Sequence, residues 1–271
     1  MHVRIRARRT ARFVGPAAVA LGAVAATPAA PSAKAAVLWG TNFENGGLGV
    51  YKGVRKEGSG LRGRAAITTQ RARTGSRSLK ITLPPATSGG TVGRYQLVAD
   101  MPDGKPGDDR WYGFSFSLGN DWNLRQIADN RSYFLGGTGF RYTQTAANGP
   151  GANLDGAIVR GRPQWVMGSN LQSSVGTDHV GEHRLGRIVK NRWTDVVLHI
   201  RWTTASSGIR DTWVNGVKVG SYRGRTLGMN SQFEHRIGLY EGTGVNQTRT
   251  IYIDNHRVGT SYASVNPARA R

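Results

Sequence analysis

Apolar and polar residues alternate along much of this chain, a pattern that is typical of β-strands. The cleanest alternation runs through Trp111–Leu118, where Tyr112, Phe114, Phe116 and Leu118 share one face. Gly113, Ser115 and Ser117 line the other face. We expect a strand with such a small second face to lie on the floor of a concave sheet.

The same period of two predicts strands along most of the chain. They span Leu38–Glu44, Ala66–Thr69, Ser78–Leu83, Val92–Ala99, Trp193–Trp202, Arg236–Tyr240 and Thr250–Val258, with weaker candidates at Ser132–Leu135, Ala157–Val159 and Gln164–Met167. An Asn-Gly pair at Asn215-Gly216 predicts a hairpin turn within Thr212–Val219. No segment predicts a helix of more than two turns. Many short strands joined by glycine-rich turns predict a single all-β domain built as a two-sheet antiparallel sandwich.

The first 35 residues have the order of parts that a secretory signal peptide has. Five arginines precede the apolar run Phe13–Ala26, and Ala33-Lys34-Ala35 has the small-x-small form of a cleavage site. The apolar run is too short to span a bilayer. We therefore expect residues 1–35 to be a signal peptide, 36–265 the folded domain and 266–271 a tail. The secreted product would be extracellular, and Arg8-Arg9 leaves twin-arginine export open beside the general route.

Charge and cysteine content narrow the functional classes. The 271 residues contain no cysteine, which excludes disulfides and thiolate metal sites. Removing residues 1–35, which hold six Lys or Arg and no acid, would lower the formal net charge from +21 to +15. Such a balance favours a polyanionic partner, although an arginine-rich coding bias spread over a solvated surface would give the same number.

The segment Arg236–Tyr240 combines a core face with a face that could bind an anion. Ile237 and Leu239 would point into the core, while Arg236, Gly238 and Tyr240 point the other way. A cation and a phenol would then lie on either side of a residue with no side chain, an arrangement that could hold an anionic sugar. The alternative is an Arg and a Tyr on an ordinary sheet surface.

Several motifs resemble the secreted polysaccharide lyases of the heparin lyase I and glucuronan lyase type. The resemblance covers residues 38–261 and rests on Trp111-Tyr112-Gly113-Phe114-Ser115-Phe116, Asp121-Trp122, Trp193–Trp202, Trp213-Val214-Asn215-Gly216, Ile237-Gly238-Leu239-Tyr240 and Tyr252-Ile253-Asp254-Asn255. It implies a concanavalin A-like β-jelly roll whose concave sheet forms a substrate groove. It also implies cleavage of a uronic-acid polysaccharide by β-elimination. We expect no cofactor.

The resemblance also suggests which side chains act. β-Elimination needs a group that neutralises the uronate carboxylate, a base that takes the adjacent proton and an acid that protonates the leaving oxygen. Related lyases carry Lys-x-Gly-x-Tyr where this chain has Arg236–Tyr240, which makes Tyr240 the candidate acid or base and Arg236 a catalytic cation. His199 is a candidate base, because its charge changes near neutral pH. Arg94, Gln96 and Arg201 are candidates for binding the substrate carboxylate.

Two positions depart from the family pattern. The early strand of the family carries Arg-x-Glu, but Arg94-Tyr95-Gln96 has an amide in place of the acid. The family's Gln-x-His pair is absent from the segment after Asp121-Trp122, where Asn130, Arg131 or Tyr133 could stand in. The resemblance therefore implies the fold more firmly than the activity.

Other functions remain open from the sequence. A non-catalytic module that binds acidic glycan would use the same cations, with Tyr95, Trp165 and Tyr240 as stacking platforms. A glycoside hydrolase would need two carboxyl groups across the scissile bond, and the few glutamates after residue 35 show no such spacing. The charge would suit nucleic acid, but no nucleic-acid motif appears, so we expect neither that partner nor a membrane after cleavage, and we expect a monomer.

The sequence gives little support for a metal site. His179 and His183 are spaced for one helix face, with Asp178 and Glu182 beside them, but the surrounding glycines favour a loop. Loop oxygens could still hold a structural calcium ion.

Overall fold

The structure is a computed structural model, and it describes the larger part of the chain. The described residues are 35–85, 93–101, 104–124, 141–142, 152–173, 176–228, 233–241 and 247–269. Lys34–Arg271 forms one compact unit. Nearly all of the predicted signal peptide lies outside the described residues, as do Ser132–Leu135 and the candidates Asn130, Arg131 and Tyr133.

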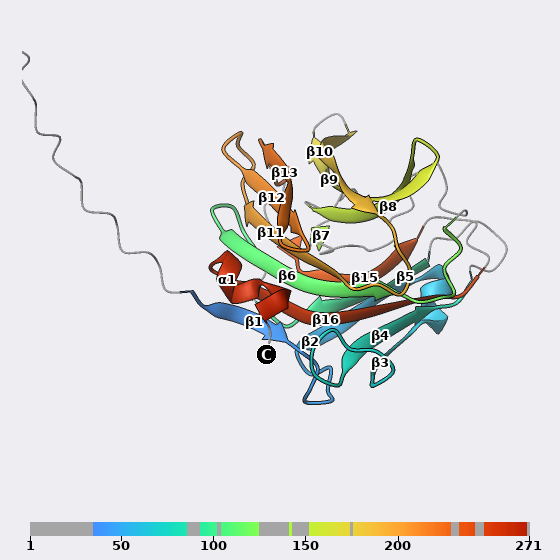
Figure 1. The fold of residues 1–271 in the computed structure, drawn as a ribbon. Helices are drawn as coiled ribbons and strands as arrows, with labels where there is room; N and C mark the ends of the chain where they lie inside the picture. The colour runs from blue at the N-terminus through green and yellow to red at the C-terminus, as the bar shows by residue number, and fades with distance from the viewer. Residues whose placement is uncertain are drawn as a thin grey trace, which may run out of the picture. The chain divides into compact units, whose positions relative to one another are not determined.

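The described residues form antiparallel β-sheets with little helix (Figure 1). The strands are β1 (Val37–Thr41), β2 (Tyr51–Glu57), β3 (Arg64–Thr68), β4 (Ser78–Leu83), β5 (Gly93–Ala99), β6 (Asp109–Leu118), β7 (Arg141–Tyr142), β8 (Asn153–Val159), β9 (Arg162–Ser173), β10 (Gly176–Arg187), β11 (Thr194–Arg201), β12 (Ile209–Val214), β13 (Val217–Arg223), β14 (Phe233–Glu234), β15 (Arg236–Glu241) and β16 (Arg249–Gly259). Short helical turns are η1 (Gly58–Arg62), α1 (Tyr262–Val265) and η3 (Pro267–Arg269). The predicted all-β fold is confirmed. No helix among these residues is long and apolar enough to cross a membrane.

The strands are arranged in one large sheet and several smaller ones. The eight-stranded sheet has the order β13-β12-β11-β6-β16-β4-β3, with β1 also paired to β16. The three-stranded sheets are β15-β5-β2 and β10-β9-β8, and β14 pairs with β7. Long curved strands β6 and β16 run side by side through the middle of the large sheet (Figure 1).

One continuous core joins these sheets. Phe114 and Phe116 of β6, Leu97 of β5, Leu239 of β15 and Trp165 of β9 all belong to the same buried cluster. Burial of such side chains supplies most of the stabilisation of a β sandwich. One face of β5 and β15 packs against the eight-stranded sheet through this core. The outer surface of β5 and β15 and the outer surface of the eight-stranded sheet therefore lie on opposite sides of the core.

The small second face of β6 does not form the floor of a groove. A Cβ on Gly113 would lie 1.9 Å from the carbonyl oxygen of Val265, so α1 packs directly on this part of the strand. Ser115 donates to Asp195 at 2.8 Å, and Ser117 accepts from Arg71 at 2.8 Å. The small residues are thus explained by the close approach of the C-terminal helix and of the loop after β3, which contradicts the sequence-based interpretation.

The Asn-Gly hairpin between β12 and β13 is confirmed. Asn215 and Gly216 have φ of 49° and 83°, and Val214 pairs with Val217 across the turn. These two positive φ values are those of the turn type that suits the twist of antiparallel strands.

Two strands, β2 and β10, lie in segments where the sequence analysis predicts no strand. The sequence of β10 has its alternation broken by bulges at Gly181 and Gly186, whose φ values are 62° and 121°. β2 is an edge strand that carries mostly charged residues and pairs only with β5 among the described residues. An edge strand with charged side chains is a common protection against unwanted pairing, and it hides the period that identifies strands.

Candidate functional site

The outer surface of β5 and β15 carries the side chains that the sequence analysis grouped around Tyr240. In the register of the two strands, Tyr240 lies opposite Arg94 and Gly238 opposite Gln96. Directly opposed residues in an antiparallel pair have side chains on the same face. We call this surface, together with Arg55 and Glu57 of β2, the arginine–tyrosine face.

Arg94 and Tyr240 are in direct contact on this face. The guanidinium carbon of Arg94 lies 4.4 Å from the centroid of the Tyr240 ring, a cation–π distance. Arg94 also forms an ion pair of 3.0 Å with Glu57, which is opposite it on β2. The side chain of Arg94 is 13 % exposed and that of Glu57 is 48 % exposed. The cation is therefore oriented by a ring and an exposed carboxylate while keeping access to solvent.

Arg236 occupies a different place from the one expected of a cation that meets substrate. Its side chain is 3 % exposed and is paired with Glu234, to which its Nε donates at 2.6 Å. Glu234 also accepts from Arg55 at 2.6 Å, and the side chain of Arg55 is 52 % exposed. Burial alone would raise the pKa of Glu234, but the hydrogen bonds from Arg55 and Arg236 hold that pKa below its usual value. Glu234 thus holds both the buried Arg236 and the exposed Arg55. Of these two arginines, Arg55 is the one that can reach a ligand.

Two features of this sheet require glycine at position 238: the backbone conformation and the close approach of β5. Its φ is 149°, and a Cβ at this position would lie 2.3 Å from the carbonyl oxygen of Tyr95. Any side chain would push β15 away from β5 and separate Tyr240 from Arg94. Gln96 lies opposite Gly238 and is 5 % exposed, so it is a buried member of the arginine–tyrosine face.

The structure does not bring His199 and Arg201 to Tyr240. Both belong to β11, and their neighbours Leu198 and Ile200 point into the core, so they lie on the outer face of the eight-stranded sheet. There Asp109 contacts both, at 2.6 Å from His199 Nε2 and 3.1 Å from Arg201 Nε. The His199 ring stacks on Trp111 at 4.2 Å between centroids. Because the core separates this surface from the arginine–tyrosine face, these two residues cannot act on the same sugar as Tyr240.

A buried histidine pair lies behind the site and was not singled out from the sequence. His235 and His256 share a hydrogen bond of 2.5 Å between their Nε2 atoms, and His256 Nδ1 lies 2.9 Å from the Tyr51 hydroxyl. Burial lowers the pKa of His235 to about 3, with the charge of Arg110 adding to the effect, and lowers that of His256 well below its usual value. Both rings are therefore neutral in the folded chain at ordinary pH.

His183 is hydrogen-bonded on both sides of its ring. Its two ring nitrogens lie 3.0 Å from the Gly181 carbonyl oxygen and 3.1 Å from Thr212 Oγ1. Burial is the largest cause that lowers its pKa. The side chain of His179 is outside the described part, and within that part no cluster of three potential metal ligands occurs.

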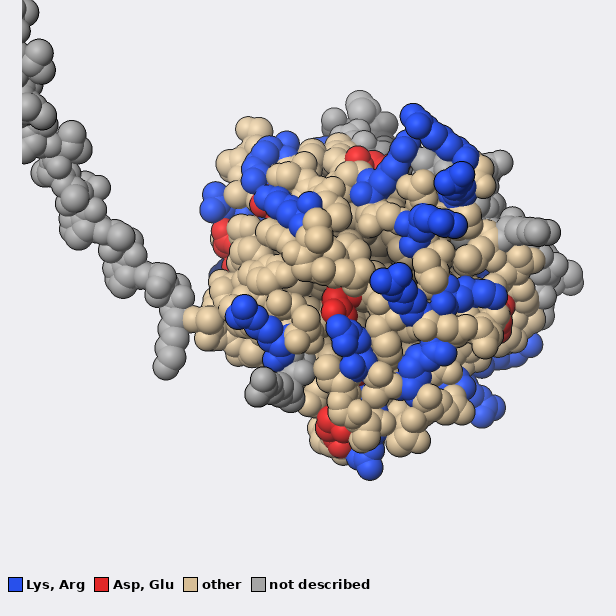
Figure 2. Space-filling view, in the orientation of Figure 1, with Lys and Arg blue, Asp and Glu red and all other residues tan. Residues whose placement is uncertain are grey.

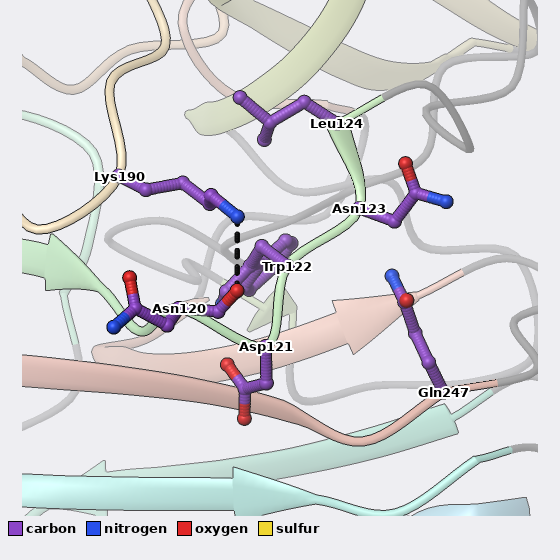
Figure 3. Close-up of a pocket in the computed structure, with 7 residues that line it drawn as sticks. All are labelled: Asn120, Asp121, Trp122, Asn123, Leu124, Lys190 and Gln247. Carbon is purple, nitrogen blue, oxygen red and sulfur yellow. Dashed lines mark hydrogen bonds between the residues drawn. The ribbon is translucent and has the colours of Figure 1, made fainter.

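A polar pocket of about 440 Å³ lies at the end of β6 (Figure 3). Its lining residues are Asn120, Asp121, Trp122, Asn123, Leu124, Lys190 and Gln247. The carboxylate of Asp121 accepts from the backbone N–H of Thr250 at 3.1 Å. Figure 3 shows Lys190 pointing toward the Asn120 carbonyl, to which its Nζ donates at 2.9 Å, while Asn123 and Gln247 lie on the other side of Trp122. Amide groups both donate and accept hydrogen bonds, which suits a ligand rich in hydroxyl groups.

Comparison with known families identifies the class of protein. Residues 43–257 match the family model described as polysaccharide lyase. The chain belongs to the polysaccharide lyase family. This match covers most of the compact unit and includes every strand of the arginine–tyrosine face. Membership makes the protein a lyase that acts on a polysaccharide, as the resemblance implied.

Solved structures support the fold. An endo-β-1,4-glucuronan lyase from the fungus Trichoderma reesei aligns with a TM-score of 0.65 at 22% identity, covering 87% of this chain and 100% of that one. A mutant of alginate lyase Aly36B bound to alginate trisaccharide gives 0.51 at 16% identity, covering 81% and 96%. The catalytic domain of a glycoside hydrolase family 131 protein from Coprinopsis cinerea gives 0.52 at 13% identity, covering 85% and 97%. A search of curated proteins finds no match. At these identities the structures show a shared β-sandwich fold, which hosts both lyases and a hydrolase.

Proposed function

We propose that this protein is a secreted lyase that cleaves a uronic-acid polysaccharide by β-elimination on the arginine–tyrosine face. The observation that carries the proposal is the contact between Arg94 and Tyr240, which places a cation and a phenol together on a partly exposed sheet surface. A uronate sugar has a carboxylate next to the carbon that must lose its proton, so it needs these two groups side by side.

Arg94 and Arg55 are the cations proposed to bind substrate carboxylates. A planar guanidinium can donate two parallel hydrogen bonds to one carboxylate, and neutralising that charge makes the adjacent C–H more acidic. Arg94 already holds the exposed Glu57 carboxylate, and an incoming uronate would take over this position. Arg55 is held by buried Glu234 and keeps its outer donors for a second uronate along the chain.

Tyr240 is proposed to carry proton transfer. In the elimination, a base removes the proton next to the carboxylate, the electron pair forms a C=C bond, and the glycosidic oxygen leaves and takes up a proton. The Tyr240 hydroxyl is proposed to act in one or both of these transfers. Asn130, Arg131 and Tyr133 remain candidates to complete the site, because they fall outside the described residues. No metal or cofactor enters this proposal.

The decisive experiment is an assay of product formation on a panel of polymers. Protein lacking residues 1–35 would be incubated with glucuronan, heparin, hyaluronan, alginate and pectate while ultraviolet absorbance of the conjugated C=C product is recorded. A rise with one polymer establishes β-elimination and identifies the uronate. Flat traces with retention of the protein on a uronate polymer would contradict β-elimination on these polymers and support binding without cleavage instead.

A further inference from the structure

The outer face of the eight-stranded sheet carries two cations gathered around one aromatic ring. Tyr252 of β16 lies between Lys80 of β4 and Ser117 of β6 in a single row across the sheet. The Arg71 guanidinium carbon is 5.0 Å from the centroid of the Tyr252 ring and Lys80 Nζ is 5.9 Å from it. We call Arg71, Lys80 and Tyr252 the Tyr252 patch.

Neutral oxygens hold both cations of the Tyr252 patch. Arg71 donates to Ser117 Oγ and to Asn191 Oδ1, each at 2.8 Å, and Lys80 donates to Gln70 Oε1 at 3.0 Å. In the described part of the chain, neither forms an ion pair with a carboxylate. Their charges are therefore fixed in position and available to an anion.

Two other cations on the same sheet face, Arg73 and Lys218, are each paired with a carboxylate. Arg73, in the same loop as Arg71, pairs with Asp195 through two hydrogen bonds of 3.0 and 2.8 Å. Lys218 lies 5.2 Å from the centroid of the Trp213 ring, as Lys80 lies near Tyr252, but it forms an ion pair of 3.0 Å with Asp211. Arg71 and Lys80 differ from these two cations in having neutral oxygens as their hydrogen-bond partners.

The patch is continuous with the pocket at the end of β6. Asn191, which accepts from Arg71, also donates its side-chain amide to Asn120. Asn120 and Lys190 line the pocket, so a row of cations and amides connects Lys80 to it. In Figure 2, the surface over β3, β4 and the neighbouring end of β16 carries many more Lys and Arg side chains than Asp and Glu.

We propose that the Tyr252 patch and this pocket form a second binding site for acidic polysaccharide, separate from the arginine–tyrosine face. The amides and the pocket would take the hydroxyl groups of a sugar residue, and Arg71 and Lys80 would take the carboxylate of the adjoining one. The site would hold a polymer chain on the enzyme while cleavage proceeds on the other face. The proposal rests on the proposed function only for the chemical class of the polymer.

Binding is tested by native electrophoresis in gels that contain glucuronan or, separately, alginate. Lys80→Ala and Tyr252→Ala would be compared in a Tyr240→Phe background, so that the polymer is not degraded. Each should weaken retention about two- to fivefold, the size expected for one exposed charge contact. Lys218→Ala is the matched control, because it removes a lysine that also lies over an aromatic ring, and it should leave retention unchanged. Thermal unfolding of each variant shows that it is folded.

The results separate this site from the proposed function. Equal losses for Lys80→Ala and Lys218→Ala would show a general charge effect and overturn the proposal, as would no loss for Lys80→Ala. Retention that depends on Lys80 in a polyphosphate gel but not in either uronate gel would also overturn it. If the wild-type chain cleaves no polymer but its retention depends on Lys80, the second site stands and the lyase proposal fails. If it does cleave, Lys80→Ala should raise KM for polymer more than KM for a uronate tetrasaccharide.

Discussion

At the residue scale, the Tyr240 hydroxyl is the group on which the proposed chemistry depends. Tyr240→Phe keeps the ring that contacts Arg94 and removes only the proton-carrying oxygen. We expect turnover to fall about 10²- to 10⁴-fold, the usual contribution of a positioned acid or base, while affinity for the polymer is kept. Ultraviolet absorbance gives the rate and native gels give the affinity.

Tyr262→Phe is the matched control for this change. Tyr262 belongs to α1, which packs on β6 and β11 at the outer face of the large sheet, so the same loss of a hydroxyl should not alter turnover. If Tyr240→Phe turned over substrate as fast as Tyr262→Phe, the role of Tyr240 would be refuted.

Glu234 and Glu57 should differ sharply in their effects on stability. Glu234→Gln leaves the buried Arg236 without its carboxylate, and loss of one partner of a buried pair typically costs about 3 kcal/mol or more. Glu57→Gln removes a half-exposed partner of Arg94 and should cost less than about 1 kcal/mol. Guanidinium unfolding of both variants measures the difference. Equal costs would mean that Glu234 does not hold the cations as the structure indicates.

The residues that share a face could be predicted from the sequence, but their partners could not. Alternation of period two correctly puts Tyr240 and Arg236 on one side of their strand and Arg94 and Gln96 on one side of theirs. Alternation does not say which sheet a strand joins, so it could not show that His199 faces away from Tyr240. The exposed Arg55 was missed because its strand has too few apolar residues to be recognised.

At the scale of the element, the pairing of β15 with β5 depends on Gly238. Gly238→Ala would combine an unfavourable φ with a clash against the Tyr95 carbonyl, so the strands must separate. We expect it to lower the free energy of unfolding by more than about 2 kcal/mol and to reduce turnover, because Tyr240 and Arg94 move apart. Chemical unfolding and the product assay measure the two effects.

Gly216→Ala separates strain from close contact. Gly216 also has a positive φ, 83°, but a Cβ there would meet nothing within 4 Å. Its replacement should therefore cost only the backbone strain, about 1 kcal/mol, with no loss of turnover. Finding that Gly216→Ala is as damaging as Gly238→Ala would contradict the close contact between β15 and β5.

Most elements with an unbroken alternation were predicted well, and so was β16 despite its bulge between Asp254 and Arg257, whereas β10 with two bulges was not. Ser78–Leu83 was predicted with the same bounds as β4, and β6, β11, β15 and β16 were found within a few residues. β10 was missed because each bulge shifts its side chains to the opposite face, so no single period runs through it. Such glycine bulges depend on the partner strand, which the sequence does not identify.

At the scale of the whole molecule, the local alternation of apolar residues predicts a two-sheet sandwich. Which segments cover the outer surface of each sheet depends on packing between residues far apart in the sequence. Strong apolar faces on β6, β11 and β16 require a second layer to cover them, and this requirement predicts two sheets. The loop at Arg71 and the C-terminal helix at Val265 cover the outer face of β6 instead of leaving it open. Neither segment carries a signal of its own that would have revealed this.

The buried histidines should make the stability of the whole molecule depend on pH. Unfolded, both imidazoles gain a proton below about pH 6.5, whereas His235 and His256 stay neutral in the fold, so stability falls as the pH falls. Each contributes a slope of about 1.4 kcal/mol per pH unit. Asp254 acts in the opposite sense, because burial raises its pKa to about 6. Between about pH 6 and 3.8 this carboxyl is protonated in the folded chain and ionised in the unfolded chain, so its contribution to stability rises as the pH falls. His183 and Glu234, whose pKa values are also lowered in the fold, act in the same sense as the two imidazoles, so the net decline between pH 6 and 4 should be at least about 1.4 kcal/mol per pH unit.

Variants of the histidine cluster test this origin of the slope. His256→Phe removes one of the two imidazoles, so the decline between about pH 6 and 4 should become shallower by about 1.4 kcal/mol per pH unit. Tyr51→Phe removes the hydroxyl that contacts His256 without removing a group that titrates in this range, so the decline should persist. Guanidinium unfolding at a series of pH values gives the slopes directly. A decline in His256→Phe as steep as in the wild type would show that other groups set the acid sensitivity of the fold.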